Sequence, residues 1–294
     1  MTTTQPNDVE LQLADLMAEC YANPLKHVMV SYPWGSGSLE GRTGPDTWQA
    51  EFLRELGAEV RKRKFDGVTA VDPIQFATAS GHGIGKSCMT AFIIRWIMDT
   101  RPFSKGIVTA NTSEQLRTKT WAELAKWHHL GLTKHWWTLN AGGGGSMNMY
   151  HNAHRETWRV DAQTCREENS EAFAGLHAAN ATPFYIFDEA SAVPDKIWEV
   201  REGGLTDGEP MTFDWGNPTR NSGRFFENME GRFRHRFIRR SIDSRDVAIT
   251  NKELFKKWIE DYGEQSDFCK VRIFGQFPSA GELQFIPGED VTKG

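Results

Sequence analysis

The stretch Phe76-Ala-Thr-Ala-Ser-Gly-His-Gly-Ile-Gly-Lys-Ser87 decides how the rest of the chain is interpreted. The apolar run at residues 74–79 predicts a buried strand, and apolar residues at helical spacing after the stretch predict an amphipathic helix. Between them, Gly81, Gly83 and Gly85 let the backbone wrap closely around a ligand. Strand, glycine-rich turn and helix together predict a phosphate-binding loop at a helix N-terminus.

The lysine and serine that end this stretch indicate its chemistry. Lys86 would reach the β- and γ-phosphates of a nucleotide, and the Ser87 hydroxyl would hold Mg²⁺. The whole loop, with His82 and Ile84 included, is therefore predicted to bind ATP. The usual pattern has glycine five residues before the Gly-Lys pair, where this chain has Ser80, so the prediction depends on the strand–turn–helix context. A glycine-rich turn with an exposed lysine is the alternative interpretation.

A second apolar run, at residues 183–187, ends in Asp188 and Glu189 and predicts a strand that delivers two carboxylates at its carboxyl edge. We expect this strand beside the phosphate-loop strand. Asp188 would then meet the Mg²⁺ held by Ser87, and Glu189 would act on the water that attacks the γ-phosphate. A buried strand that ends in two solvated acids is the alternative, which the phosphate loop upstream disfavours.

The composition is that of a core-forming enzyme. Of the 294 residues, 39% are hydrophobic and 25% are charged, and the net charge is −5. No stretch has the pattern of a signal peptide or membrane span, so we expect a cytosolic protein. Predicted strands and helices alternate along the chain. This order predicts an α/β fold with a central, mostly parallel sheet flanked by helices, plus small helical and lid additions at both ends.

Hydrophobic periodicity and capping residues predict the other elements. Asp46 or Thr47 would cap a helix over residues 48–60, and Thr112 or Ser113 would cap another. Further helices are predicted over residues 9–21, 169–177 and 252–262, and further strands over residues 106–111, 157–162, 211–215, 233–242 and 271–277.

Two basic patches offer possible contacts with DNA phosphates. One is the run from Arg61 to Lys64; the other is Arg232, Arg234 and Arg236, which would share one face of a predicted strand. An ordinary solvated surface is the alternative for both patches, and for the first we favour it. The three alternating arginines are therefore the predicted DNA-binding residues.

Several motifs follow one another in an order that resembles the ATPase domain of terminase large subunits from tailed bacteriophages. They are Trp48-Gln49, the loop from Gly81 to Ser87, Gln115, Asp188-Glu189-Ala190 and Gly216-Asn217-Pro218-Thr219. The resemblance covers roughly residues 45–278. It implies a P-loop NTPase fold of the RecA-like ASCE class, and a Mg²⁺-dependent ATPase that drives double-stranded DNA into a procapsid.

The resemblance also implies partners and a place of action. A homo-oligomeric ring would assemble on the portal protein, with the terminase small subunit as a further partner and without membrane contact. The isolated chain would be a monomer. Packaging would take place in the host cell cytoplasm, at the procapsid portal.

Residue roles carried over from the resemblance concern both ends of the nucleotide. Gln49 would read the adenine and Trp48 would line its pocket, although a helix start with a core tryptophan would look the same. Asn217 and Thr219 would form a coupling motif that senses the γ-phosphate, with a plain strand-to-loop turn as the alternative.

The chain departs from the family in its arginines. His82 stands where many members have arginine, and residues 175–183, ahead of the acidic pair, contain none. We therefore expect a catalytic arginine from a neighbouring subunit, and we favour Arg166 over Arg220 and Arg224.

The predicted organisation is one motor domain over residues 1–278. It comprises an adenine-side segment (1–72), a P-loop core (73–245) and a lid segment (246–278), followed by a linker (279–294) toward an absent nuclease domain. No nuclease activity is expected in this chain. Two other functions stay open: another DNA-dependent motor such as a helicase, and a regulatory module that binds nucleotide without hydrolysing it.

Overall fold

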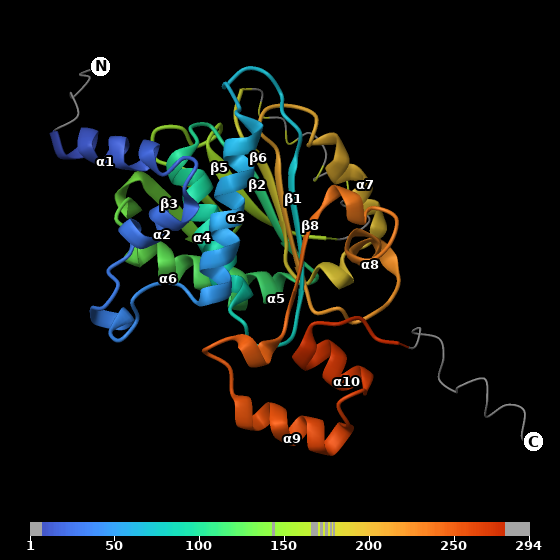
Figure 1. Ribbon diagram of the computed structural model, residues 1–294. Helices are drawn as coiled ribbons and strands as arrows, with labels where there is room; N and C mark the ends of the chain where they lie inside the picture. The colour runs from blue at the N-terminus through green and yellow to red at the C-terminus, as the bar shows by residue number, and fades with distance from the viewer. Residues whose placement is uncertain are drawn as a thin grey trace, which may run out of the picture.

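A computed structural model describes residues 8–142, 145–165, 170, 173, 176, 178 and 180–279. In this part of the chain eight strands form one sheet, in the order β3-β4-β5-β2-β6-β7-β1-β8 (Figure 1). The strands are β1 (Ile74–Ser80), β2 (Lys105–Ala110), β3 (Trp137–Ala141), β4 (Met147–His151), β5 (Arg159–Thr164), β6 (Pro183–Phe187), β7 (Met211–Gly216) and β8 (Ile238–Ile242). All pairs from β5 to β8 are parallel, and only the β3–β4 and β4–β5 pairs are antiparallel. The predicted α/β fold with a mostly parallel sheet is confirmed.

The acidic strand does not lie beside the phosphate-loop strand, so that prediction is wrong. Strand β7 separates them: Phe213 pairs with Phe76 of β1 on one side and with Ile186 of β6 on the other. All residues of β7 are buried, which suits a central strand of a sheet covered on both faces. As a result, the residue that follows β7, Asn217, comes between the loop after β1 and the acids after β6.

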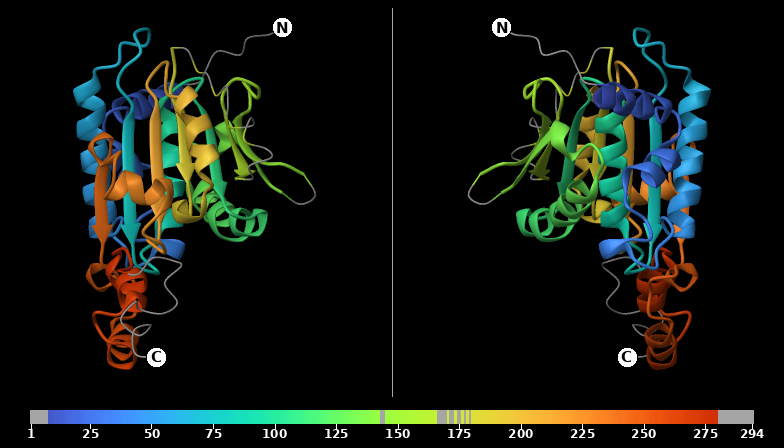
Figure 2. Two further views of the ribbon diagram at one scale, coloured as in Figure 1. Left: turned by 90° about the vertical axis from the view of Figure 1, so that its right-hand side faces the viewer. Right: turned by 90° about the vertical axis from the view of Figure 1, so that its left-hand side faces the viewer.

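Helices cover both faces of the sheet, as the two views of Figure 2 show from opposite sides. One face carries α3 (Thr47–Arg63), α4 (Lys86–Thr100) and α6 (Ala122–Leu130), and the other carries α7 (Asp195–Gly203) and α8 (Gly223–Met229). The alternation of β1 residues divides the core accordingly. Phe76 packs toward α3, with its ring centroid 4.5 Å from that of Phe52, whereas Ala77 belongs to the second core with Trp198 of α7.

Local capping explains where the N-terminal helices begin. Asp46 caps α3 in a capping box with Gln49, which confirms one of the two predicted caps. The first helix, α1, spans Asp8–Glu19. Asn23 does more than end it, because its side chain accepts from the Lys26 N–H and starts a second helix, α2 (Pro24–Ser31), with Pro24 in the first turn.

Two predicted strands are wrong or too long. In the first, β8 begins only at Ile238, and Arg234–Arg236 forms a 3-10 helix, η6. Arg232, Arg234 and Arg236 therefore do not share a strand face. Alternation misled here because Phe233 packs under arginines from a turn, with the Arg232 Cζ 4.3 Å from its ring centroid.

The predicted strand at residues 271–277 is also absent. Lys270–Phe274 is a π-helical turn, η8, that follows the short helix α10 (Asp267–Cys269). Two consecutive residues, Ile273 and Phe274, are both buried in one small core with Phe255, a pattern that a strand could not produce.

A hairpin and a helical C-terminal segment complete the fold. The hairpin β3–β4 flanks the Gly-Gly-Gly-Gly-Ser loop at residues 142–146 and was not predicted. The helix α9 (Lys252–Tyr262) agrees with its prediction and lies with α10 below the edge of the sheet where β1 ends (Figure 1). The predicted helix over residues 169–177 falls largely outside the described residues. Among the described helices, none combines the length and apolar character that crossing a membrane requires.

Candidate active site

The phosphate loop connects β1 to α4 and is shaped by its glycines. Gly85 caps α4 at φ 86°, a left-handed conformation that favours glycine. Gly81 has no room for a side chain, since a Cβ would lie 2.3 Å from the Ile273 carbonyl oxygen. The loop therefore has its predicted form, and it is packed against the C-terminal segment.

Trp48 and Gln49 hold this loop from the start of α3. The Trp48 Nε1 donates to the Ile84 carbonyl oxygen over 2.9 Å, and the Gln49 Nε2 donates to the Gly85 carbonyl oxygen over 3.2 Å. The Gln49 Oε1 accepts from the Asp46 N–H over 3.0 Å. Both ends of the Gln49 amide therefore have protein partners.

Lys86 lies at the first position of α4 and points back toward the sheet. Its Nζ donates to the Ser80 Oγ over 3.0 Å and to the Asn217 Oδ1 over 3.4 Å. Burial lowers the pKa of Lys86, while the charges of Asp188 and Glu189 oppose that shift. The lysine therefore has acidic neighbours and a phosphate-loop position at once.

Asp188 is buried at the carboxyl end of β6. Burial raises the pKa of its carboxyl, and a hydrogen bond from Thr120 together with the charge of Lys86 opposes the rise. The Thr120 Oγ1 donates to the Asp188 Oδ2 over 2.6 Å. Asp188 and Ser87 line the same cleft, and a carboxylate with a hydroxyl is a donor pair that Mg²⁺ accepts. Within the described ranges no group of three or more His, Cys, Asp or Glu residues is arranged to hold a metal ion, so the predicted Mg²⁺ would depend on these two ligands and the phosphates.

Glu189 adopts a strained backbone and its carboxylate is held at both oxygens. Its φ of 55° and ψ of 45° are left-handed, a conformation that costs on the order of 1–3 kcal/mol in a residue other than glycine. The Gln115 Nε2 donates to the Glu189 Oε2 over 2.7 Å, and the Lys119 Nζ lies 3.4 Å from the Oε1. Such strain concentrates at functional sites, which points to a role for this carboxylate.

Asn217 connects the two halves of the site. Its Nδ2 donates to the Ser80 carbonyl oxygen over 2.7 Å while its Oδ1 accepts from Lys86. Its own carbonyl oxygen accepts from the Ser191 Oγ over 2.6 Å, just after the acidic pair. Thr219 is exposed and donates from its backbone N–H to the same carbonyl over 2.8 Å.

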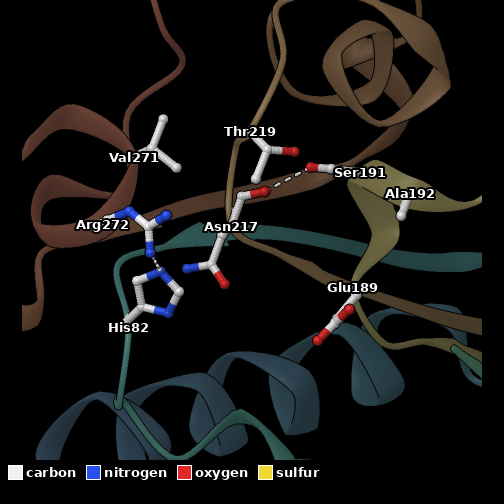
Figure 3. A pocket seen from close by; sticks show the side chains of 8 residues that line it. All are labelled: His82, Glu189, Ser191, Ala192, Asn217, Thr219, Val271 and Arg272. Atoms are coloured by element: carbon white, nitrogen blue, oxygen red, sulfur yellow. Dashed lines mark hydrogen bonds between the residues drawn. The ribbon is translucent and has the colours of Figure 1, made fainter. Parts of the chain in front are cut away.

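These residues surround a cleft of about 470 Å³. Its lining includes Arg42, Gln49, His82, Gly83, Ile84, Gly85, Lys86, Ser87, Lys119, Lys126, Asp188, Glu189 and Asn217. A second pocket of about 230 Å³ adjoins it (Figure 3). That pocket is lined by His82, Glu189, Ser191, Ala192, Asn217, Thr219, Val271 and Arg272.

Some predicted site residues lie away from the cleft. The Trp48 indole is buried against the loop and does not line the cleft. Arg232, Arg234 and Arg236 lie near η6, where Arg236 donates to Glu202 of α7. Arg166 lies outside the described residues.

Sequence reasoning missed several residues that contact the acidic pair. Thr120 and Lys119 are both in a π-helical turn, η2 (Leu116–Trp121), which follows the short helix α5 (Ser113–Gln115). Lys119 comes four residues after Gln115, one helical turn, so both can reach Glu189. That spacing was a usable signal, whereas the π-helical turn that brings Thr120 to Asp188 had none.

Together these features define the class of protein. The chain has the fold of a P-loop NTPase, with a phosphate loop between β1 and α4 and an acidic pair after β6, one strand away. More particularly, it is similar to the "Probable terminase, large subunit" of Enterobacteria phage P7, with 25% identity over 291 residues that cover 93% of this chain and 54% of the relative. The chain thus spans about half the length of that relative, and no family model matches it.

Solved structures of terminases share the fold. The large terminase ATPase domain of Thermus phage P74-26 superposes with a TM-score of 0.52 at 17% identity, over 69% of this chain and 88% of that chain. The HK97 bacteriophage large terminase gives 0.55 at 12% identity, over 87% and 55%. A large terminase from a thermophilic bacteriophage, in complex with ADP, gives 0.53 at 15% identity, over 69% and 48%. The resemblance predicted from the sequence, and the P-loop fold it implied, are confirmed.

Proposed function

We propose that this chain is an ATPase that powers translocation of double-stranded DNA into a phage procapsid, as the motor part of a terminase large subunit. The observation that carries the proposal is the convergence of Lys86, Asp188 and Glu189 on one cleft, with Asn217 between them. The similarity to the P7 relative, and the ADP bound in the thermophilic phage terminase, support a nucleotide as the ligand.

The chemistry is hydrolysis of the bond between the β- and γ-phosphates. Lys86 would contact the phosphate oxygens, and Ser87 with Asp188 would hold a Mg²⁺ that offsets the phosphate charge. Glu189 would orient the attacking water and accept its proton, a task for which a carboxylate fixed by Gln115 is suited. The water oxygen bonds to the γ-phosphorus as the bridging oxygen leaves with ADP.

Other roles follow from position in the site. We infer that Gln49 and Trp48 shape the phosphate loop, and that Gln49 contacts adenine only if its amide exchanges a loop hydrogen bond for the base. Asn217 is suited to sense the γ-phosphate because it already contacts Lys86, and Thr219 would pass the change on.

The wider assignment includes partners. We propose a homo-oligomeric ring on the portal, in the host cytoplasm, with the terminase small subunit as a partner and an arginine supplied in trans by Arg166. Arg224 is a poor candidate for that arginine, because it pairs with Glu202 at 2.7 Å and stacks on Phe233. Absence of nuclease activity stays a prediction, as do the domain limits.

Two rival functions make different use of the same site. A regulatory module that only binds nucleotide has no use for Glu189, whose backbone strain and held carboxylate favour turnover instead. A helicase would separate strands, which a packaging motor does not.

The test is ATP turnover with and without double-stranded DNA, in the wild-type chain and in Lys86→Ala and Glu189→Gln. We expect DNA to stimulate wild-type turnover and both substitutions to abolish it, with nucleotide affinity reduced strongly only in Lys86→Ala. Near wild-type turnover in Glu189→Gln would contradict the assigned base. Strand displacement by the wild type would favour the helicase.

A further inference from the structure

The smaller pocket of about 230 Å³ contains a cation that the proposed hydrolysis does not yet use. Figure 3 shows Arg272 and His82 on one side of the pocket and Glu189 on the other, with Asn217 between. His82, Glu189 and Asn217 also line the larger cleft, so the two spaces meet at the side chains assigned to the γ-phosphate end.

Arg272 is anchored to the phosphate loop through the main chain. The His82 N–H donates to the Arg272 carbonyl oxygen over 2.8 Å, and the Ser244 Oγ donates to the His82 carbonyl oxygen over 2.8 Å. Gly81 fits against the Arg272 carbonyl so closely that a Cβ would lie 2.8 Å from it. The guanidinium is therefore tied to the loop although it belongs to the C-terminal segment.

The charge of Arg272 is not matched by a carboxylate. Among the described residues it forms no ion pair, and its Nη1 lies 3.4 Å from the His82 Nε2. Burial and then the charges of Lys86 and Arg272 lower the pKa of His82, so this imidazole is neutral near pH 7 and can accept from the guanidinium. The Glu189 carboxylate faces the same pocket but is already held by Gln115 and Lys119.

We propose that Arg272 contacts the γ-phosphoryl group from the same chain and supplies the positive charge that His82 does not. The inference rests on the proposed ATPase function and adds a residue to it. During hydrolysis, negative charge develops on the γ-phosphoryl oxygens as the water oxygen bonds to phosphorus, the bridging oxygen departs with ADP and the water proton passes to Glu189. A guanidinium can donate two parallel hydrogen bonds to such oxygens, which a lone ammonium cannot.

This role would also connect hydrolysis to the position of the C-terminal segment. Arg272 moves with α10 and η8, whose small core includes Ile273 and Phe274. Departure of the γ-phosphate would remove an anionic partner of Arg272, so the segment would be held differently before and after hydrolysis.

The experiment compares Arg272→Ala with Arg245→Ala. Arg245 is a matched control, because it lies in the same C-terminal segment, packs its guanidinium 4.4 Å from the Phe274 ring and lines neither pocket. We expect Arg272→Ala to lower kcat about 10- to 1000-fold, the range for removing one donor to a developing oxyanion. Trapping of ADP with aluminium fluoride should be abolished, ADP affinity should stay within about twofold, and Arg245→Ala should match the wild type.

The outcomes separate this inference from the proposed function. Wild-type turnover with an unchanged Arg272→Ala would overturn the role of Arg272 alone. A wild-type chain that neither binds nor hydrolyses ATP would overturn both. If Arg272→Ala fails to fold, Arg272→Gln decides instead, because it keeps much of the stem over Phe268 and removes only the charge.

Discussion

The Lys86 ammonium donates to the Ser80 hydroxyl over 3.0 Å, and Ser80 is the residue at which this phosphate loop departs from the usual glycine. The same hydroxyl donates to the Gly81 carbonyl oxygen over 2.9 Å, so it serves the turn and the lysine together. Phosphate oxygens must therefore compete with a protein acceptor for Lys86.

Removing this acceptor should tighten nucleotide binding. We expect Ser80→Ala to lower the ATP dissociation constant about threefold or more, since one neutral hydrogen bond is worth about 0.5–1.5 kcal/mol, and to reduce folding stability by about 1 kcal/mol. Calorimetric titration with ATP and denaturant unfolding measure the two effects. The control is Thr78→Val, on the same strand, whose hydroxyl has no partner among the described residues. Weaker ATP binding in Ser80→Ala would show that the serine orients Lys86 instead of competing for it.

The Gln115 amide should matter for catalysis more than for binding. It donates to the Glu189 Oε2 over 2.7 Å and so fixes the carboxylate assigned to the attacking water. We expect Gln115→Ala to lower kcat about tenfold or more with little change in ATP affinity, because only orientation of the base is impaired. Glu114→Gln is the control on the same short helix, since Glu114 pairs with Arg117 and lies in neither pocket. A larger change in ATP affinity than in kcat would assign Gln115 to nucleotide binding.

His128 should make stability fall as the pH is lowered. Burial, then the charges of Arg95 and His129, lower the pKa of this buried imidazole from 6.5 to about 4. The unfolded chain therefore binds the proton more readily. The contribution of neutral His128 is present above pH 6.5 and disappears as the pH falls toward 4.

The expected decrease between about pH 7 and about pH 5 is on the order of 2 kcal/mol of unfolding free energy. Denaturant unfolding at both values measures it. His128→Asn should flatten this dependence, whereas exposed His129→Asn should leave it unchanged. An equally steep dependence in His128→Asn would move the cause to other groups.

The three arginines of the predicted DNA surface should not contribute equally. Arg232 and Arg234 are exposed, whereas Arg236 is paired with Glu202 at 2.5 Å. Replacing Arg232 and Arg234 with glutamine should weaken DNA binding at all sequences and reduce the salt slope by roughly 0.9 for each phosphate interaction removed, while Arg236→Gln should change it less. Salt titrations of affinity measure the slopes, with Lys62→Gln, 73% exposed on α3, as the control. Unchanged affinity and slope would make this an ordinary solvated surface.

The sequence predicted local elements well where one chain segment decides them. Hydrophobic runs located β1, β6 and β7 within a residue or two, and the cap at Asp46 located α3. Alternation failed at Phe233, because period-two spacing does not distinguish a strand from a turn that buries one aromatic ring beneath arginines.

What no local pattern could show is how distant segments meet. The insertion of β7 between β1 and β6 depends on sheet order, and it brings Asn217 to Lys86. The contact of Arg272 with His82 joins residues 190 positions apart in the chain. Such contacts follow from packing of the whole domain, so Arg272 carried no signal in its own segment.

Subunit mixing should distinguish an arginine supplied in trans from one supplied in cis. Lys86→Ala inactivates its own cleft but leaves its arginines intact. If Arg166 acts on the neighbouring subunit, mixing Lys86→Ala with Arg166→Ala should restore part of the turnover, because Arg166→Ala clefts receive an arginine from Lys86→Ala neighbours; such arginines are worth about 10³ to 10⁵ in rate. Arg272 is tied to its own phosphate loop through the His82 N–H, so mixing Lys86→Ala with Arg272→Ala should restore nothing. The measurement is turnover against mixing ratio at protein concentrations that favour assembly. Rescue of Arg272→Ala would make Arg272 the trans arginine, and turnover per chain that depends on neither concentration nor mixing would refute a trans arginine altogether.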